Sequence, residues 1–467
     1  MGKRRTLGSM VCAVAMVGTA LVAGPTAATA DNPDRTAAHQ AAVSTAAVDS
    51  QALEQSLSEA PSKGLQTPFE ASNGADWTTV EQAQAFLEDL EASSERVALH
   101  EVGASGEGRP INLMTIGSPA PKSPEDIADG SFILFNCSIH GNEPSGREGC
   151  LQLARDMSTT TDPAWNRLLR QTTVGFIYTN PDGWVADTRG NADGTDVNRD
   201  FMALETPEAQ ALAKVIRDWN PDVLNDLHEY GPREYYDTAA LVLWPRNRNV
   251  DETIHRLSER MVNDYTGAQI EANGMTSGIY GLLVKDGVPF QQVAGDGQAR
   301  ILRNYAGLKH VTGQLTEAAS GPVTAEEEND PLLTNRRRVS VQYASSVGSL
   351  AMISENRTRL ARQSDAAAQR ATEAGASQSG VVYFDGQDNM VPTTPEGAEP
   401  DPMCGYQLSG AQLEELASTL ELQDVSWEEN ADGAFVSMAQ PSQPLIPLLL
   451  DERSEFGLVA ATPLDDC

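Results

Sequence analysis

The sequence predicts an α/β protein in which a mixed, mostly parallel twisted sheet carries helices on both faces, followed by a small C-terminal α+β module. Apolar runs of strand length alternate with stretches of helical periodicity through the middle of the chain. This alternation favours parallel strands that are packed between helices. With 467 residues, the chain is long enough for two or three domains, each with its own core.

The first 30 residues have the features of a secretory signal peptide. A basic head is followed by an apolar middle and by small residues that end at Ala30. We therefore expect cleavage after Ala30 and a secreted, extracellular protein, although the apolar middle alone is also compatible with a membrane anchor. Residues 31–74 are rich in Ala, Ser, Gln and Asp, which favours a mostly disordered linker or pro-segment.

The net charge of −33 limits the partners of the protein. A chain this acidic repels nucleic acid and anionic membranes, so we expect neither as a partner. No stretch after the first 30 residues is long and apolar enough to cross a bilayer, and no stable membrane association is expected. Four cysteines follow the signal peptide, which allows disulfides: Cys404 with Cys467 would tie down the chain end, whereas Cys137 is expected to be packed apolar bulk.

Residues 75–375 are predicted to form the main domain. A helix and a hairpin with a glycine-rich turn come first, and strands then alternate with helices until a long closing helix. The predicted helices span 76–94, 146–157, 206–219, 251–273 and 335–373, and the predicted strands lie within 96–117, 131–139, 172–180, 221–231 and 308–318.

Two further segments follow the main domain. Residues 376–403 are rich in Gly, Pro, Asp and Thr, which is typical of a linker. Residues 404–467 combine one predicted helix, 409–422, with short strands, and we expect them to form a small separate module. Its sequence does not indicate what the module does.

The stretch "CSIHGNEPSG", residues 137–146, places His140 and Glu143 where an apolar strand ends and a helix begins. Sites in α/β sheets are built at such strand ends. Of the six histidines, only His140 and His228 end strands, and with Glu143 they form a His₂Glu set that suits one catalytic Zn²⁺ ion with a position left for water. The alternative is that each histidine caps a helix or packs locally.

The segment "TNPDGWVADTRGNADGTDVNRDF", residues 179–201, is a polar, glycine-rich loop between strands that should reach the same edge of the sheet. It carries Arg189, Asn198 and Arg199. Arginine binds carboxylates through a planar fork and asparagine adds a neutral donor, so these side chains suit the C-terminal carboxylate of a peptide close to the metal. The alternative is an exposed loop whose arginines make surface ion pairs.

The stretches "HGNE", "NPDG", "RGNADGTDVNRDF", "DLH" and "QLTEA" occur in this order, and the sequence resembles the M14 family of zinc carboxypeptidases over residues 75 to 370. The opening "GASGEGRPI" is similar to the early hairpin of that family. The resemblance implies a zinc carboxypeptidase fold and catalytic domain for residues 75–375. It also implies the following roles: His140, Glu143 and His228 as ligands of one Zn²⁺ ion, Asp196 as the outer carboxylate on the first histidine, Arg189 polarising the scissile carbonyl, Asn198 and Arg199 holding the terminal carboxylate, and Glu317 as the general base.

The chain departs from the family pattern in ways that affect the expected substrate. The family has a substrate-capping tyrosine, but no tyrosine stands at that position, and Tyr280 is the candidate to replace it. Asp200 replaces the commoner asparagine of the family. Asp296, in a "GDG" stretch, is a candidate to face a basic side chain, although such a stretch is more often only a turn.

From these residues we expect a secreted zinc-dependent metallocarboxypeptidase that hydrolyses the C-terminal bond of a peptide or protein substrate by a zinc-activated water. One alternative is an M14-like amidohydrolase acting on cell-wall peptides or N-acyl amino acids. The other is a non-catalytic zinc-containing binding protein. A binding protein has no need of a general base such as Glu317 or an oxyanion donor such as Arg189, which favours an enzyme.

Overall fold

The computed structural model describes residues 65–127, 130–384, 398–400 and 403–467, with only the backbone described at 398–400. The chain divides into two compact units, Met1–Ala41 and Ala42–Cys467, and every described residue belongs to the second. The predicted signal peptide and most of the segment 31–74 therefore lie outside the described residues. Among the helices that the structure does describe, none combines the length and the apolar character that a membrane span requires.

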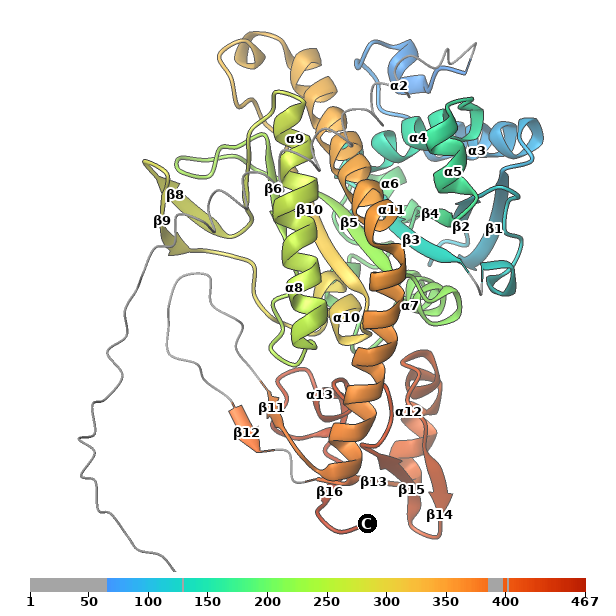
Figure 1. Ribbon diagram of the computed structural model, residues 1–467, viewed down its shortest axis with the longest axis vertical. Coiled ribbons are helices and arrows are strands. Elements are labelled where there is room, and N and C mark those ends of the chain that lie inside the picture. The colour runs from blue at the N-terminus through green and yellow to red at the C-terminus, as the bar shows by residue number, and fades with distance from the viewer. Residues whose placement is uncertain (1–64, 128–129, 385–397, 401–402) are drawn as a thin grey trace, which may run out of the picture. The chain divides into compact units, whose positions relative to one another are not determined.

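An eight-stranded sheet forms the centre of the main domain, and Figure 1 shows it crossed by helices. Four of its neighbouring pairs are parallel and three are antiparallel, so the predicted mixed, mostly parallel sheet is confirmed. The strands lie in the order β1 (Val97–Ala104), β2 (Pro110–Ile116), β4 (Thr172–Ile177), β3 (Ser131–Asn136), β5 (Val223–Tyr230), β10 (Thr312–Ala319), β6 (Ala240–Leu243) and β7 (Ser277–Ile279).

Both faces of this sheet are buried, because neighbouring residues of one strand pack into different hydrophobic clusters. On β3, Ile133 and Phe135 pack on one face, whereas Phe132 and Leu134 pack on the other. A strand that is buried on both faces is a continuous apolar run, which explains the sequence "SFILFN". The first face is covered by α3 (Val80–Ser93), α4 (Pro144–Thr159) and α11 (Pro331–Ser377), and the second by α7 (Pro207–Trp219) and α10 (Leu302–Leu308).

Local sequence signals explain where the helices begin and end. Helix α7 starts after Thr206, whose hydroxyl accepts a hydrogen bond from the Ala209 amide, and Pro207 occupies its first turn. It ends at Asn220, which adopts the left-handed conformation that commonly stops a helix. The predicted helix 251–273 is confirmed as α8 (Glu252–Arg260) and α9 (Ala268–Ala272), joined by a π-helical turn over Met261–Gly267. The other helices of the main domain are α2 (Pro68–Ala71), α5 (Pro163–Leu169) and α6 (Pro181–Ala186), and a hairpin of β8 (Leu282–Lys285) and β9 (Val288–Gln292) leads to α10.

The folded chain includes residues 65–74, which the sequence analysis assigned to the linker or pro-segment. The short helix α2 has a capping box between Thr67 and Glu70, and Phe69 is buried. Glu70 also forms an ion pair with Arg155 of α4. These contacts attach the segment to the main domain.

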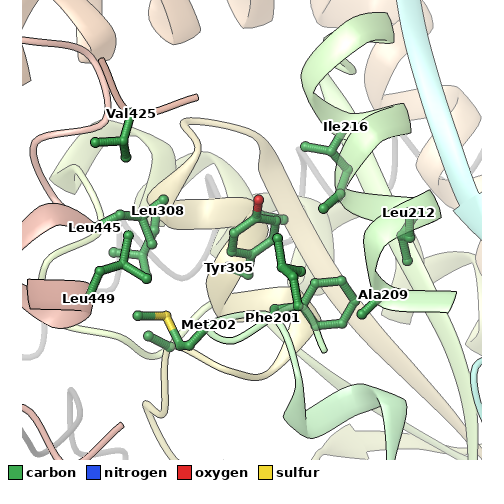
Figure 2. Close-up of a cluster of buried hydrophobic side chains, with 14 of the residues drawn as sticks. Phe201, Met202, Ala209, Leu212, Ile216, Tyr305, Leu308, Val425, Leu445 and Leu449 are labelled. Carbon is green, nitrogen blue, oxygen red and sulfur yellow. The ribbon is translucent and has the colours of Figure 1, made fainter. Parts of the chain in front are cut away.

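The C-terminal residues form a small sheet of four strands with two helices. Figure 2 shows how side chains of this part, Val425, Leu445 and Leu449, lie in one hydrophobic cluster with Met202 and Leu308 of the main domain. The C-terminal part and the main domain therefore share a core, while the boundaries at 376–403 and 404–467 stay predictions. The elements are β13 (Gly405–Ser409), α12 (Gly410–Leu422), β14 (Glu428–Asn430), β15 (Gly433–Ser437), α13 (Ile446–Leu450) and β16 (Thr462–Leu464), and β11 (Val381–Tyr383) pairs with β12 (Ala398–Pro400) before them.

Two details differ from the sequence analysis. Cys137 is not simply packed bulk, because it forms a disulfide with Cys150 on α4, and a second disulfide joins Cys404 to Cys467. His310, expected inside a strand, instead has a positive φ of 63° in the turn before β10. Its Nε2 atom donates to the Pro441 carbonyl at 2.8 Å, so this histidine has a structural contact with the C-terminal part.

Candidate metal centre

Four adjacent strands, β4, β3, β5 and β10, bring the candidate residues to one edge of the sheet. His140 and Glu143 lie in the loop between β3 and α4, and His228 lies near the end of β5. Glu317 of β10 is the direct register partner of His228 on the neighbouring parallel strand. Because parallel strands end at the same edge, residues far apart in the sequence meet there.

Two glycines hold the His140 loop in place. A Cβ atom added at Gly141 would lie 1.8 Å from the Gly183 carbonyl carbon, so only glycine allows the two backbones to approach this closely. The side chain of Asn180 supports the same contact: its Oδ1 accepts from the Gly183 amide at 2.9 Å and its Nδ2 donates to the Ile139 carbonyl at 3.0 Å. The "HGNE" and "NPDG" stretches are thus two interlocked turns.

The donor atoms of His140, Glu143 and His228 converge on one point, and we name these three residues the histidine cluster. Each offers a ligand atom, and these atoms lie within 4.8 Å of one another in a buried environment. Glu143 places Oε1 2.8 Å from Nδ1 of His140 and Oε2 2.9 Å from Nδ1 of His228. The two Nδ1 atoms are 3.1 Å apart, and nitrogens that face each other at this distance need a proton or a cation between them.

A carboxylate holds the other nitrogen of each histidine ring. His140 Nε2 lies 3.0 Å from Asp196 Oδ1, and His228 Nε2 lies 2.7 Å from Asp226 Oδ2. Such a carboxylate fixes the tautomer and leaves the Nδ1 lone pair free for a metal, so the residues fit a zinc ion. The sequence analysis expected Asp196 at this place but missed Asp226, which is fully buried and accepts a further hydrogen bond of 2.8 Å from Asn136.

The charges around the histidine cluster favour a cation. Burial acts to raise the pKa of the Glu143 carboxyl, but the positive charges and hydrogen bonds of His140 and His228 outweigh it and hold that pKa well below its usual range. Burial acts to lower the pKa of His228, but the negative charges of Asp226 and Glu143 outweigh it and raise that pKa well above its usual value. The cluster therefore stabilises positive charge at its centre.

Glu317 faces the same space with one free oxygen. Its side chain is buried, and its Oε2 atom has no hydrogen-bond partner. Burial raises the pKa of Glu317 to about 8, while the positive charge of His228 acts in the opposite direction. Tyr280, which the sequence left as a candidate, lines the same cavity, and the negative charge of Glu317 together with burial raises the pKa of its hydroxyl.

The loop residues named from the sequence also reach the site, and they differ in exposure and in hydrogen bonding. Arg189 is about half exposed, and it donates from Nε to Asp196 at 2.9 Å and from Nη1 to Glu143 at 3.2 Å. Asn198 is buried; its Nδ2 lies 3.3 Å from Asp226 Oδ2, and its Oδ1 accepts from the Leu302 amide at 2.8 Å. Arg199 donates to the carbonyl of Asn198 at 2.7 Å.

Asp200, a departure from the family pattern, and Asp296, the candidate to face a basic side chain, do not line the cavity of the histidine cluster. Asp200 caps a turn, where its Oδ2 accepts from both the amide and the hydroxyl of Thr206 at 2.7 Å. Asp296 lines a separate cavity and accepts from the Gln298 amide at 3.2 Å. Neither carboxylate is therefore placed to bind a basic substrate side chain.

A cavity of about 310 Å³ connects these groups. It includes two arginines, Arg233 and Arg303, that the sequence analysis did not single out. Arg303 was hard to identify because it lies between Leu302 and Asn304 of α10, in a segment that the sequence analysis assigned to no helix or strand. The residues predicted from the sequence that line this cavity are His140, Arg189, Asn198, Arg199, His228, Tyr280 and Glu317.

Comparison with protein families gives a match over residues 83–282 to the family described as zinc carboxypeptidase. Carboxypeptidase 2 of Trichophyton rubrum is 28% identical over 207 residues, which covers 42% of this chain and 38% of the relative. Carboxypeptidase E of Caenorhabditis elegans is 32% identical over 147 residues, which covers 27% of this chain and 29% of the relative. The chain thus matches well under half the length of these curated relatives.

Solved metallo-carboxypeptidases are also similar to this chain. The structure from Burkholderia cenocepacia has a TM-score of 0.46 and 19% sequence identity, and the match covers 59% of this chain and 69% of that one. The structure from Pseudomonas aeruginosa, in complex with (2-guanidinoethylmercapto)succinic acid, has a TM-score of 0.44 and 18% identity, and the match covers 60% of this chain and 69% of that one. The family match ends at residue 282, so Glu317 and Arg303 lie beyond it.

Proposed function

We propose that this chain, which matches the zinc carboxypeptidase family over residues 83–282, hydrolyses the C-terminal peptide bond of peptides or proteins. The observation that carries the proposal is the convergence of the histidine cluster on one point, in the cavity that Glu317 and Arg199 also line. A metal site, a carboxylate with a free oxygen and a free guanidinium are the three groups that the reaction needs in one place.

His140, Glu143 and His228 would hold the zinc ion. A zinc ion bound there would supply Lewis-acid chemistry and make a water molecule acidic enough to ionise near neutral pH. Asp196 and Asp226 would keep both Nδ1 atoms directed at it, since each accepts the Nε2 proton of one histidine ring. All five side chains come from buried or partly buried positions, so the site is preorganised.

Glu317 and Arg189 would act on the reacting groups. Oε2 of Glu317, which has no partner, is free to take a proton from water and to pass it to the leaving amine. Arg189 is half exposed and already directs Nη1 to Glu143, so it can reach the carbonyl oxygen of the bond being cleaved and stabilise negative charge there.

Arg199 and Asn198 would hold the terminal carboxylate of the substrate. No carboxylate oxygen of the described residues lies within 4.0 Å of the Arg199 guanidinium, which leaves its fork free for a ligand. Asn198 Nδ2 carries two N–H groups and lies 3.3 Å from Asp226 Oδ2 and 3.1 Å from His228 Nε2, which places this amide beside Arg199 and the histidine cluster. A free carboxylate at the end of the substrate is therefore the feature that this part of the site recognises.

The experiment compares one peptide that ends in a free acid with the same peptide as its C-terminal amide. The zinc-loaded wild type should cleave the acid on the order of 30-fold or more faster in kcat/KM, because the amide leaves the Arg199 charge without a partner. Arg199→Ala should slow the acid far more than the amide, and Arg199→Lys should rescue only part of the loss. Arg256→Ala is the control, since Arg256 is an exposed arginine of α8 paired with Glu252.

Equal rates on acid and amide by the wild type would contradict a carboxypeptidase. Such a result would favour an endopeptidase or amidase while leaving the metal site in place. Absence of cleavage of any peptide by a zinc-loaded, folded protein would favour a binding protein instead. The acid–amide ratio thus separates a carboxypeptidase from an endopeptidase or amidase, and the absence of cleavage identifies a binding protein.

We also propose that the protein is exported after removal of residues 1–30. The two disulfides, Cys137–Cys150 and Cys404–Cys467, support the proposal because disulfides persist in oxidising compartments. Mass spectrometry of the mature N-terminus from the culture medium of an expressing host should find Asp31 as the first residue. Recovery of an intact Met1 end only within the cells would contradict export.

A further inference from the structure

Arg303 is a buried cation that the proposed chemistry does not use. Its side chain is 3% exposed and lines the cavity of the histidine cluster. Its one hydrogen bond runs from Nη2 to the backbone carbonyl of Asp296 at 2.5 Å, and its Nε has no partner. No carboxylate oxygen of the described residues lies within 4.0 Å of this guanidinium.

Arg199 lines the same cavity and also has no ion pair within the described part of the chain. We name Arg199 and Arg303 the arginine pair. Arg189 differs from both, because Asp196 and Glu143 neutralise it. Burial lowers the pKa of Arg303; the negative charge of Asp296 acts in the opposite direction, and the positive charges of Arg246 and Arg199 lower that pKa further.

A ligand with one carboxylate can neutralise only one member of the arginine pair. The other member then stays buried against the ligand without a counter-charge, which is unfavourable. A ligand with two carboxylates can neutralise both, whichever arginine takes which group. A basic ligand side chain would add a further positive charge to a cavity that Arg199, Arg303 and Arg233 already line.

We propose that the site selects substrates whose last residue has an acidic side chain, so that one carboxylate comes from the chain terminus and the other from aspartate or glutamate. This proposal rests on the proposed carboxypeptidase function and names its substrate class. The whole chain has a net charge of −33, so its general field repels acidic ligands. Within such a protein, Arg199, Arg303 and the exposed Arg233 form a local region of positive charge, because all three line this cavity without an ion pair among the described residues.

The test uses matched peptides that end in glutamate or in its neutral isostere glutamine. The zinc-loaded wild type should cleave the glutamate peptide on the order of 30-fold or more faster in kcat/KM. Arg303→Met should bring the ratio close to one, mainly by slowing the glutamate peptide, and Arg303→Lys should keep part of it. Arg256→Met should leave the ratio unchanged, because Arg256 is an exposed arginine of α8 that pairs with Glu252 and does not line the cavity.

A second measurement does not depend on cleavage. Calorimetry on the metal-free wild type should detect binding of N-acetyl-L-glutamate that is at least about tenfold tighter than binding of N-acetyl-L-glutamine, and Arg303→Met should remove the difference. If the wild type cleaves glutamine- or leucine-ended peptides as fast as glutamate-ended ones, the selectivity proposal is wrong and the carboxypeptidase proposal stands. If no free-acid peptide is cleaved, the carboxypeptidase proposal fails, and equal binding of the two N-acetyl amino acids then overturns the acidic pocket as well.

Discussion

Each histidine ring of the histidine cluster is fixed through both of its nitrogens. The guanidinium groups of the arginine pair, which line the same cavity, donate hydrogen bonds only to backbone carbonyls within the described part of the chain. On the first side, His140 meets Glu143 and Asp196, and His228 meets Glu143 and Asp226. On the second side, Arg199 and Arg303 donate to one carbonyl each. The protein thus supplies the counter-charges for the metal side and leaves those of the other side to the ligand.

This difference separates chemistry from selection within one cavity. Groups that must hold a metal need fixed orientation, and the carboxylates behind them provide it. Groups that must recognise a substrate need charge that is not yet satisfied, because satisfied donors have nothing to offer a ligand. Substitutions in the histidine cluster should therefore affect metal binding and turnover, and substitutions in the arginine pair should affect substrate affinity.

The largest effect should come from removing a metal ligand. His228→Ala leaves two protein ligands, which hold zinc poorly, so metal content and activity should both be lost. The loss of affinity should exceed the roughly 10–100-fold that follows from losing an outer partner of a ligand. Elemental analysis of the purified variant, with His310→Ala as a control for loss of a buried histidine elsewhere, checks the prediction; near-stoichiometric zinc in His228→Ala would reject the ligand assignment.

Glu317→Gln should stop the chemistry while leaving the metal in place. The amide keeps the shape of the side chain but cannot take a proton, so kcat should fall by roughly 10²- to 10⁴-fold. Zinc content should remain equal to that of the wild type. Glu271→Gln is the matched control, because Glu271 is exposed and its carboxylate bonds to Ser277; unchanged kcat in Glu317→Gln would move the base to another carboxylate, with Glu229 of the cavity next to be tested.

The outer carboxylates should have a smaller effect that falls on metal affinity. Asp226→Asn is expected to weaken zinc binding by roughly 10- to 100-fold, because the His228 ring loses the acceptor that fixes its tautomer. Asp196→Asn should weaken binding less, since Asp196 is partly exposed and also pairs with Arg189. Competition with a chelator measures both affinities. Asp222→Asn, just before β5, should leave zinc affinity unchanged, and an equal loss there would mean a general effect of strand stability.

The metal side was largely predictable from the sequence because its signals are local. His140 and Glu143 follow an apolar run directly. Such fully apolar strands are typical of parallel sheets, and parallel strands end at the same edge. Asp226 was missed although it stands two residues before His228, on the same face of a strand. Period-two spacing was the signal that could have found it. The sheet and the positions of its strands were predictable for the same reason, since buried strands and amphipathic helices have different periods.

The arginine side was not predictable because it depends on how distant segments pack. Arg199 came from a recognisable loop, but nothing in "ILRNYAGL" distinguishes a buried Arg303 from an exposed one. Its burial follows from the packing of α10 between the sheet and the C-terminal part. The shared core with residues 404–467 was likewise unexpected, because a separate module and a packed one have the same local pattern.

A substitution in the C-terminal part should change substrate binding by the arginine pair and not metal binding, and this is the smallest effect that we expect. Gln423 is fully buried, and its Nε2 donates to the carbonyls of Phe201 at 2.8 Å and Met202 at 3.1 Å, which stand two and three residues after Arg199. Figure 2 shows Phe201 and Met202 in the cluster that includes Leu445 and Leu449. The C-terminal part is therefore in contact with the loop that presents the proposed carboxylate ligand.

Gln423→Leu keeps a side chain of similar size but removes both hydrogen bonds. Two buried carbonyls then lack a donor, and the free energy of unfolding should fall by about 1–3 kcal/mol. Looser positioning of Arg199 should raise KM for a free-acid peptide roughly 2- to 10-fold, which corresponds to about 0.4–1.4 kcal/mol of binding. Both kcat and zinc content should stay near the wild-type values, because the histidine cluster has no contact with Gln423.

Denaturant titration and steady-state kinetics measure these quantities, with Gln369→Leu on the exposed face of α11 as the control. A lower unfolding free energy with unchanged KM would show that the C-terminal part only stabilises the fold, and a loss of zinc would show that the two sides of the cavity are not independent.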